Sequence, residues 1–121
     1  MGVIKVAIAD DHKIFRKGVI LSLRPYSAIK FVQEAENGQE LLDGLAASEP
    51  DVVLMDLRMP VKDGIAAVRE IRVTHPEARV LMLTTFDGDT DIHRAIQAGA
   101  RGYVLKNTTG DKLIPALRAV A

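Results

Sequence analysis

Residues 3–11, VIKVAIADD, place two adjacent aspartates, Asp10 and Asp11, directly after a nearly continuous apolar run. Such a run is typical of a strand that is buried on both faces of a parallel sheet covered by helices. Two like charges side by side must be solvated, paired or neutralised. One interpretation is helix capping, because Asp is a preferred N-cap residue. The other is a charged site at the end of the strand, and the rest of the chain bears on that choice.

Apolar, largely β-branched runs alternate with stretches of helical periodicity along the whole chain. This alternation, with short connections, predicts an α/β doubly wound sheet of five parallel strands with right-handed crossovers, for which we take the flavodoxin-like strand order 2-1-3-4-5. Gly99 is placed to end one helix, whereas Pro115 interrupts the last one, which must start late or be kinked. The predicted strands are 3–9, 29–35, 51–56, 79–84 and 101–106, and the predicted helices are 13–26 (ending near Pro25), 38–47, 64–75, 89–100 and 111–121.

Length and composition limit the class of protein. With 121 residues, of which 48% are hydrophobic, we expect one domain spanning residues 1–121 with a real core. Sixteen basic residues balance sixteen acidic ones, which disfavours a general nucleic-acid or membrane-surface binder. The chain has no cysteine, which excludes a disulfide framework and a catalytic thiol. Neither a signal peptide nor a membrane span is predicted, so we expect a cytoplasmic domain.

Ionisable or hydroxyl side chains close four of the five predicted strands. Asp10 and Asp11 follow the first strand, Asp56 ends the third, Thr84 ends the fourth and Lys106 ends the fifth. Ligands of open α/β sheets bind at the carboxyl ends of the strands, beside the switch point, where the first and third strands are neighbours. Three carboxylates together need a counter-charge, and hard oxygen ligands suit Mg²⁺ best, with Mn²⁺ or Ca²⁺ as alternatives.

The two remaining groups have chemistry that suits a phosphoryl group. Lys106 would act as a point charge for a phosphoryl oxygen, and Thr84 would donate from its hydroxyl. A carboxylate beside Mg²⁺, Lys and Thr is equipped for nucleophilic attack on phosphorus. Taken singly, Lys106 is more typical of a solvated surface charge and Thr84 of an ordinary strand residue. Their order along the strands is the informative signal.

These motifs resemble the receiver domain of bacterial two-component response regulators across essentially the whole chain. ADDH (9–12) is similar to the acidic pair, and VVLMDLRMPVKDG (52–64) to the phosphoacceptor segment. VLMLTTF (80–86) is similar to the switch-threonine strand, and GYVLK (102–106) to the lysine strand. The details are most similar to the NarL/FixJ (LuxR-type) subfamily. The resemblance implies the CheY-like (βα)5 form of the predicted fold.

The resemblance also implies a regulatory phosphoacceptor rather than a turnover enzyme. A cognate sensor histidine kinase would supply a phosphoryl group to Asp56, and the domain would assist its own phosphotransfer and dephosphorylation. Mg²⁺ would be bound by Asp11, Asp56 and the backbone carbonyl of Arg58, with Asp10 reaching it through water. Thr84 and Tyr103 would form the switch pair, which reshapes the surface of the last two helices and the strand between them.

The same resemblance implies an output that these 121 residues do not contain. The subfamily carries a DNA-binding domain after the receiver, so control of transcription would run through a C-terminal domain absent from this chain. The chain is then either cut from a longer regulator or a stand-alone receiver. A homodimer that forms on phosphorylation is a further implication.

Some positions depart from the family pattern, and others have an effect that the sequence does not define. Asn107 stands where many receivers have proline after the lysine, so the isomer of the Lys106–Asn107 peptide bond is open. Arg58 and Phe86 fall at positions that tune the lifetime of the phosphoryl group in the family. His12 and the two other histidines are interpreted as surface or capping residues, and none is assigned to a metal.

Three other classes of protein compete with a phosphorylated switch. A haloacid-dehalogenase-type phosphatase would need an Asp-x-Asp spacing after the first strand, whereas here the aspartates are adjacent. A flavin or nucleotide binder would need a glycine- or hydroxyl-rich phosphate loop there, and this chain has acids instead. A receiver-like interaction module that is never phosphorylated stays an alternative.

Overall fold

The computed structural model describes residues 2–85, 89–108 and 110–121. Five strands form one parallel sheet in the order β2-β1-β3-β4-β5, which confirms the predicted topology. Phe86, one of the two positions expected to tune the phosphoryl lifetime, lies outside the described residues. The elements are β1 (Ile4–Ala9), α1 (Lys13–Leu23), β2 (Ile29–Ala35), α2 (Gly38–Ser48), β3 (Val52–Asp56), α3 (Gly64–Thr74), β4 (Arg79–Thr84), α4 (Asp89–Ala98), β5 (Gly102–Leu105) and α5 (Gly110–Val120).

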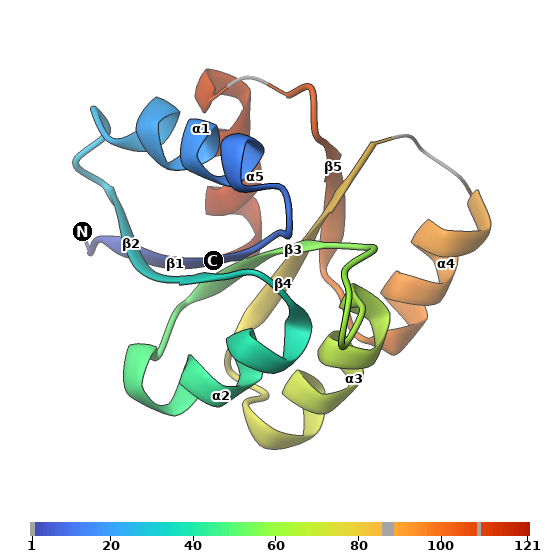
Figure 1. Cartoon of the computed structure of the whole chain (residues 1–121). Coiled ribbons are helices and arrows are strands. Elements are labelled where there is room, and N and C mark those ends of the chain that lie inside the picture. The colour runs from blue at the N-terminus through green and yellow to red at the C-terminus, as the bar shows by residue number, and fades with distance from the viewer. Residues whose placement is uncertain (1, 86–88, 109) are drawn as a thin grey trace.

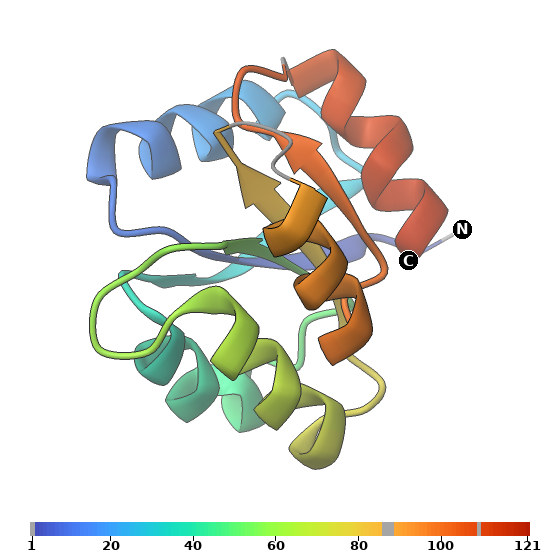
Figure 2. The same cartoon turned by 90° about the vertical axis from the view of Figure 1, so that its right-hand side faces the viewer.

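Helices cover both faces of this sheet. Figures 1 and 2 show α1 and α5 on one face and α2, α3 and α4 on the other. Two apolar clusters fill the two interfaces, one around Leu41 and Ile71 and the other around Leu23 and Leu117. All five residues of β3 are buried, as the apolar run predicts for a central strand. No described helix is both long and apolar enough to cross a lipid bilayer.

The predicted elements agree with the observed ones to within one or two residues at most ends. The first helix ends at Leu23, before the Pro25 that was expected to stop it. Gly99 directly follows α4 with a φ of +127°, a backbone conformation that residues other than glycine rarely adopt. Its expected role in ending that helix is confirmed.

Two local expectations need correction. The N-cap residue of α1 is His12 and not one of the two aspartates, and the His12 side chain makes no capping hydrogen bond. Helix α5 runs from Gly110 to Val120 with Pro115 inside it, so a late start is wrong. Pro115 lies on the exposed side of the helix, while Leu113, Ile114 and Leu117 are buried against the sheet. Tertiary packing therefore holds the helix despite the missing backbone donor.

Candidate functional site

The sheet brings the predicted polar residues to one edge. Asp10 and Asp11 follow β1, Asp56 ends the neighbouring β3, and Thr84 ends β4. Lys106 follows β5, and its backbone N–H donates to the Thr84 carbonyl at 2.8 Å. The clustering predicted from strand ends is thus present in the fold, because parallel strands all end at the same edge.

Lys106 is the counter-charge of two buried carboxylates in this fold. Its Nζ lies 2.8 Å from Asp10 Oδ2 and 3.2 Å from Asp56 Oδ2. The side chains of Asp10, Asp56 and Lys106 are only 0%, 7% and 10% exposed. The ammonium also stands 4.8 Å from the centre of the Phe15 ring, on α1. Lys106 is therefore part of the site and not a solvated surface charge.

Asp56 has an unusual affinity for a proton in this environment. Burial raises the pKa of its carboxyl group most, and the Asp10 charge raises it further, from 3.8 to about 6. The opposing effects on that pKa, from Lys106 and from the backbone N–H of Arg58, are weaker. One positive charge does not neutralise the site, so a second cation would be bound favourably.

The connection between β3 and α3 shapes the other wall of the site. The Lys62 N–H donates to the Pro60 carbonyl at 2.7 Å, which closes a γ-turn with Val61 at a φ of +67°. A β-branched residue with positive φ is strained. The turn leads to Asp63, whose side chain caps α3 by accepting from the Ala66 N–H at 2.9 Å.

A pocket of about 160 Å³ opens over these residues. Asp56, Thr84 and Lys106 line it, together with Arg58 and Asp91. The Arg58 guanidinium forms an ion pair with Asp91 of α4, which links the β3–α3 connection to that helix across the pocket. No peptide bond between described residues is cis, so the Lys106–Asn107 bond is trans.

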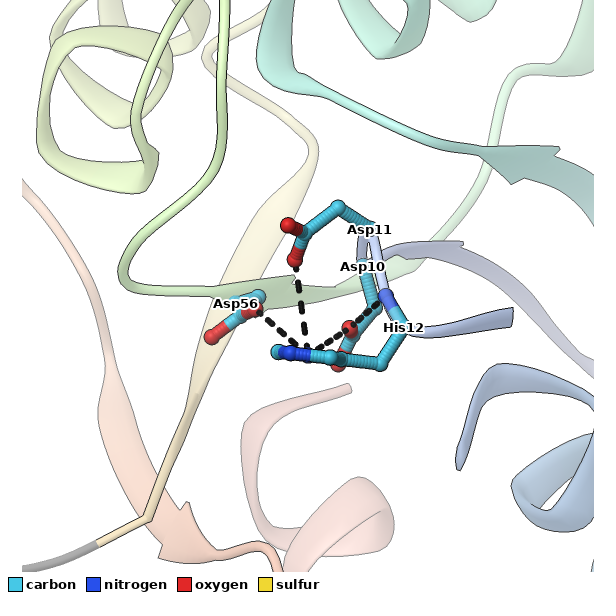
Figure 3. Close-up of side chains that lie close together, drawn as sticks. All are labelled: Asp10, Asp11, His12 and Asp56. Atoms are coloured by element: carbon cyan, nitrogen blue, oxygen red, sulfur yellow. Dashed lines mark hydrogen bonds and ion pairs between the residues drawn. The ribbon is translucent and has the colours of Figure 1, made fainter. Parts of the chain in front are cut away.

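His12 belongs to the site, which the sequence interpretation missed. Its Nδ1 lies 3.2 Å from Asp10 Oδ1, 3.4 Å from Asp11 Oδ1 and 4.0 Å from Asp56 Oδ2. Figure 3 shows the imidazole pointing toward all three carboxyl groups. The ring is 65% exposed, so the residue is a surface histidine as expected, but it does not cap α1 through its side chain. The sequence feature that could have identified His12 as a site residue is its position directly after the aspartate pair.

A buried arginine, Arg16 of α1, was also missed. Its Nη1 donates to the Asp10 carbonyl at 2.6 Å, and its Nε donates to Glu34 of β2 at 2.7 Å. Lys17 also binds Glu34, and the bond from Arg16 lowers the pKa of that carboxyl group most. Arg16 thus ties the end of β1, which carries Asp10 and Asp11, to the end of β2.

The donor set fits a hard divalent cation. Ligand atoms of Asp10, Asp11, His12 and Asp56 all lie within 4.8 Å of one another. Asp10 Oδ2 is fully buried and has an ion pair with Lys106 but no hydrogen bond within the described part of the chain. Carboxylate oxygens are the ligands that Mg²⁺ prefers. The adjacent Lys106 and Thr84 add the point charge and the hydroxyl group that a phosphoryl group would need.

This fold and this edge of the sheet define a class of signalling protein. Residues 6–118 match the family model of the response regulator receiver domain. The chain belongs to this family of two-component signalling domains. The resemblance noted in the sequence is therefore confirmed at the level of the family, and receiver domains bind Mg²⁺ at their acidic pocket.

Particular relatives fall within the LuxR/NarL group of response regulators. The chain is 39% identical over 117 residues to the transcriptional regulatory protein LnrK of Bacillus subtilis, which covers 97% of this chain and 53% of LnrK. Its fold matches the signal receiver domain of a NarL response regulator from Mycobacterium tuberculosis, with a TM-score of 0.93 and 33% identity. The match covers 98% of this chain and 96% of the NarL domain. The isolated receiver domain of RcsB from Salmonella enterica, solved with the phosphomimetic BeF3⁻, matches with a TM-score of 0.87 and 29% identity. This match covers 98% of this chain and 88% of the RcsB domain.

The chain spans about half the length of the curated relatives that it matches, 53% of LnrK and 50% of the regulator DegU of Brevibacillus brevis.

Proposed function

We propose that this domain is a phosphorylation-activated switch in which Asp56 accepts a phosphoryl group from a sensor histidine kinase. The observation that carries the proposal is the convergence of Asp10, Asp56 and Lys106 at the carboxyl edge of the sheet, with Nζ–O distances of 2.8 and 3.2 Å. Neutralising such a cluster requires a cation, and a pocket over Asp56 leaves room for a phosphoryl group. The receiver family provides the reaction that this arrangement suits.

Transfer would consist of attack by an Asp56 carboxylate oxygen on phosphorus. An acyl phosphate O–P bond forms while the P–N bond of the donor phosphohistidine breaks, and its electron pair returns to the imidazole. Lys106 and Thr84 donate to the phosphoryl oxygens and hold the group in line. Mg²⁺, when bound, neutralises charge that develops on those oxygens. Its ligands would be Asp11, Asp56 and the Arg58 carbonyl, with Asp10 acting through water.

The signal would then pass through β4 and β5. Thr84 pairs with Leu105, and Met82 pairs with Tyr103, so Thr84 and Tyr103 are two positions apart on adjacent strands. Tyr103 is 45% exposed here. In the proposed switch, the Thr84 hydroxyl moves toward the phosphoryl group and the Tyr103 ring turns inward. The α4-β5-α5 surface changes as a result, because a dianionic group biases two packings that differ by a few kcal/mol.

The biological setting is part of the same proposal. The family favours the cytoplasm, a cognate histidine kinase as partner, and one receiver domain over residues 1–121. Names such as transcriptional regulatory protein LnrK suggest control of transcription through a DNA-binding domain outside these residues. Phosphorylation would promote a homodimer, for which size-exclusion chromatography with light scattering, with and without BeF3⁻, is the direct check.

The central test is intact-mass spectrometry after incubation with acetyl phosphate and Mg²⁺. We expect wild-type protein to gain one phosphoryl group, and neither Asp56→Asn nor an EDTA-treated sample to gain any. Asp51→Asn is the matched control, because Asp51 directly precedes β3 at the end opposite Asp56. This variant should label like wild type. Catalytic turnover without a labelled species would favour a phosphatase. Wild-type protein that stays unlabelled even with a kinase donor would favour an interaction module.

A further inference from the structure

The imidazole of His12 is the one nitrogen donor among the ligand atoms gathered at this site in the described part of the chain. The ring enters the cluster from the first residue before α1, and its Nδ1 faces Asp10, Asp11 and Asp56 at 3.2–4.0 Å. The site proposed above uses only oxygen ligands. His12 therefore raises a question of ligand chemistry that the proposed function leaves open.

The spacing of Nδ1 from the carboxylates is that of ligands around one ion. Octahedral ligands with metal bonds of about 2.1 Å stand about 3.0 Å apart when adjacent and about 4.2 Å apart when opposite. The distances from Nδ1 to oxygens of Asp11 and Asp56, the two direct carboxylate ligands of the proposed site, are 3.4 and 4.0 Å and fall between these values. Figure 3 shows that the ring already points inward, so coordination needs no change of side-chain direction.

Lys106 also approaches this nitrogen, with 3.3 Å between Nζ and Nδ1. The Asp10 carboxylate, 3.2 Å from Nδ1, would accept from the Nδ1–H tautomer, whereas an ammonium group donates only and so suits the neutral tautomer whose lone pair is on Nδ1. The same tautomer is the one that binds a metal through Nδ1. The carboxylates around Nδ1, two of which Lys106 also contacts, are metal ligands when ionised. The carboxylates of Asp10, Asp11 and Asp56 would therefore attract a cation bound to Nδ1, and the Lys106 ammonium group would oppose it in part.

An imidazole changes which cation such a site prefers. Mg²⁺ is hard and favours oxygen, whereas imidazole suits first-row transition metals. Affinity for nitrogen-containing sites rises from Mn²⁺ through Co²⁺ to Ni²⁺. A site with two direct carboxylate ligands, one backbone carbonyl and one imidazole should accordingly hold these ions more tightly than the same site without the imidazole, with a gain that grows along the series.

We propose that His12 is a direct ligand of the bound metal and sets the selectivity of this receiver for divalent transition-metal ions over Mg²⁺. The proposal rests on the metal site of the proposed function, and it adds a residue and a class of ion to that site. His12 is thereby a specificity-determining residue of the site, not a participant in phosphoryl transfer.

The test is the affinity of the whole chain for Mg²⁺, Mn²⁺, Co²⁺ and Ni²⁺, measured by calorimetry for wild type, His12→Gln and His93→Gln. Glutamine keeps a hard oxygen donor near the site but removes the imidazole. We expect His12→Gln to weaken Ni²⁺ binding about 10-fold or more, Co²⁺ less and Mn²⁺ least, and to change Mg²⁺ affinity less than about twofold. His93, exposed on α4, is the matched control and should change none of these affinities.

A spectroscopic readout separates ligation from a structural effect. With Mn²⁺ bound, electron spin echo modulation should report one imidazole nitrogen in wild type and His93→Gln, and none in His12→Gln. Equal losses for all four ions, or no nitrogen signal in wild type, would overturn the role of His12 while Mg²⁺ binding kept the proposed function intact. A wild-type chain that binds none of the ions would overturn both.

Discussion

Asp56 is a residue whose negative charge is unfavourable in the metal-free fold. Its side chain is 7% exposed, it lies beside the Asp10 carboxylate, and Lys106 compensates only in part. With its pKa raised to about 6, the folded chain binds a proton on Asp56 more tightly than the unfolded chain does. The stabilisation that this proton provides is full below pH 3.8 and is lost as the pH rises through about 6.

This imbalance predicts a stabilising substitution. Because Asn resembles the protonated carboxyl group, Asp56→Asn should raise the free energy of unfolding by about 2 kcal/mol at pH 7.5 without divalent metal. The gain should shrink as the pH falls and vanish near pH 4. Urea denaturation of both proteins in EDTA across this range measures it. Asp43→Asn, on the exposed face of α2, should have no pH-dependent gain, and a gain of equal size at pH 4 and 7.5 would contradict the electrostatic origin.

The site residues that lie at the ends of strands were predictable from the sequence. Asp10, Asp56, Thr84 and Lys106 could be grouped from sequence alone, because parallel strands end at one edge. Arg16 could not, since its partner Glu34 is 18 positions away and nothing in helical periodicity distinguishes a buried arginine from a solvated one. The roles of the grouped residues in phosphoryl transfer stay predictions until labelling tests them.

Among the elements, the junction of β3 and α3 is the most constrained. The Gly64 N–H donates to the Leu57 carbonyl at 2.9 Å. A Cβ atom at this position would lie 2.2 Å from the Asp56 carbonyl oxygen and 3.0 Å from the Met82 side chain. The helix can therefore start this close to the strand only with glycine at position 64.

A matched pair of glycine substitutions tests this constraint. Gly64→Ala should lower the free energy of unfolding by about 3 kcal/mol, since the backbone of Asp56 must shift to admit the methyl group. Gly18→Ala, in the middle of α1, meets no atom within 4 Å and should raise it by about 0.5–1 kcal/mol. Thermal and urea denaturation measure both. Equal effects of the two substitutions would mean that helix propensity, not the contact with Asp56, decides the result.

At this scale, local signals predicted the elements better than their ends. Pro115 shows why an interior proline misleads, because three buried apolar neighbours in α5 outweigh its missing donor. The aspartate pair misleads in the opposite way: its capping propensity suggested an N-cap role, but the N-cap residue of α1 is His12 and both carboxylates belong to the acidic cluster. In each case a contact distant in sequence overrides the local preference.

For the whole molecule, the alternation of strands and helices was enough to predict a doubly wound parallel sheet, and the observed order 2-1-3-4-5 is that of its flavodoxin-like form. That topology has an electrostatic consequence. It brings Asp10, Asp11 and Asp56 together at one edge, and among the described residues Lys106 is the only lysine or arginine in ion-pair contact with any of them. Folding without a metal must therefore overcome repulsion that a bound cation would relieve.

A cation that binds the folded chain alone must stabilise all of it. At a Mg²⁺ concentration 100 times its Kd, the free energy of unfolding should rise by about 2.7 kcal/mol, because the ligands from β1 and β3 come together only in the native fold. Asp11→Asn removes one partly exposed ligand, 33% accessible, without leaving a buried charge unpaired, and should remove most of the gain. Urea denaturation with and without Mg²⁺ at pH 7.5 measures both proteins. Equal gains in the two would place the stabilising ion elsewhere on the molecule, whereas a gain only in wild type would tie the stability of the sheet to the same carboxylates that the proposed phosphoryl transfer requires.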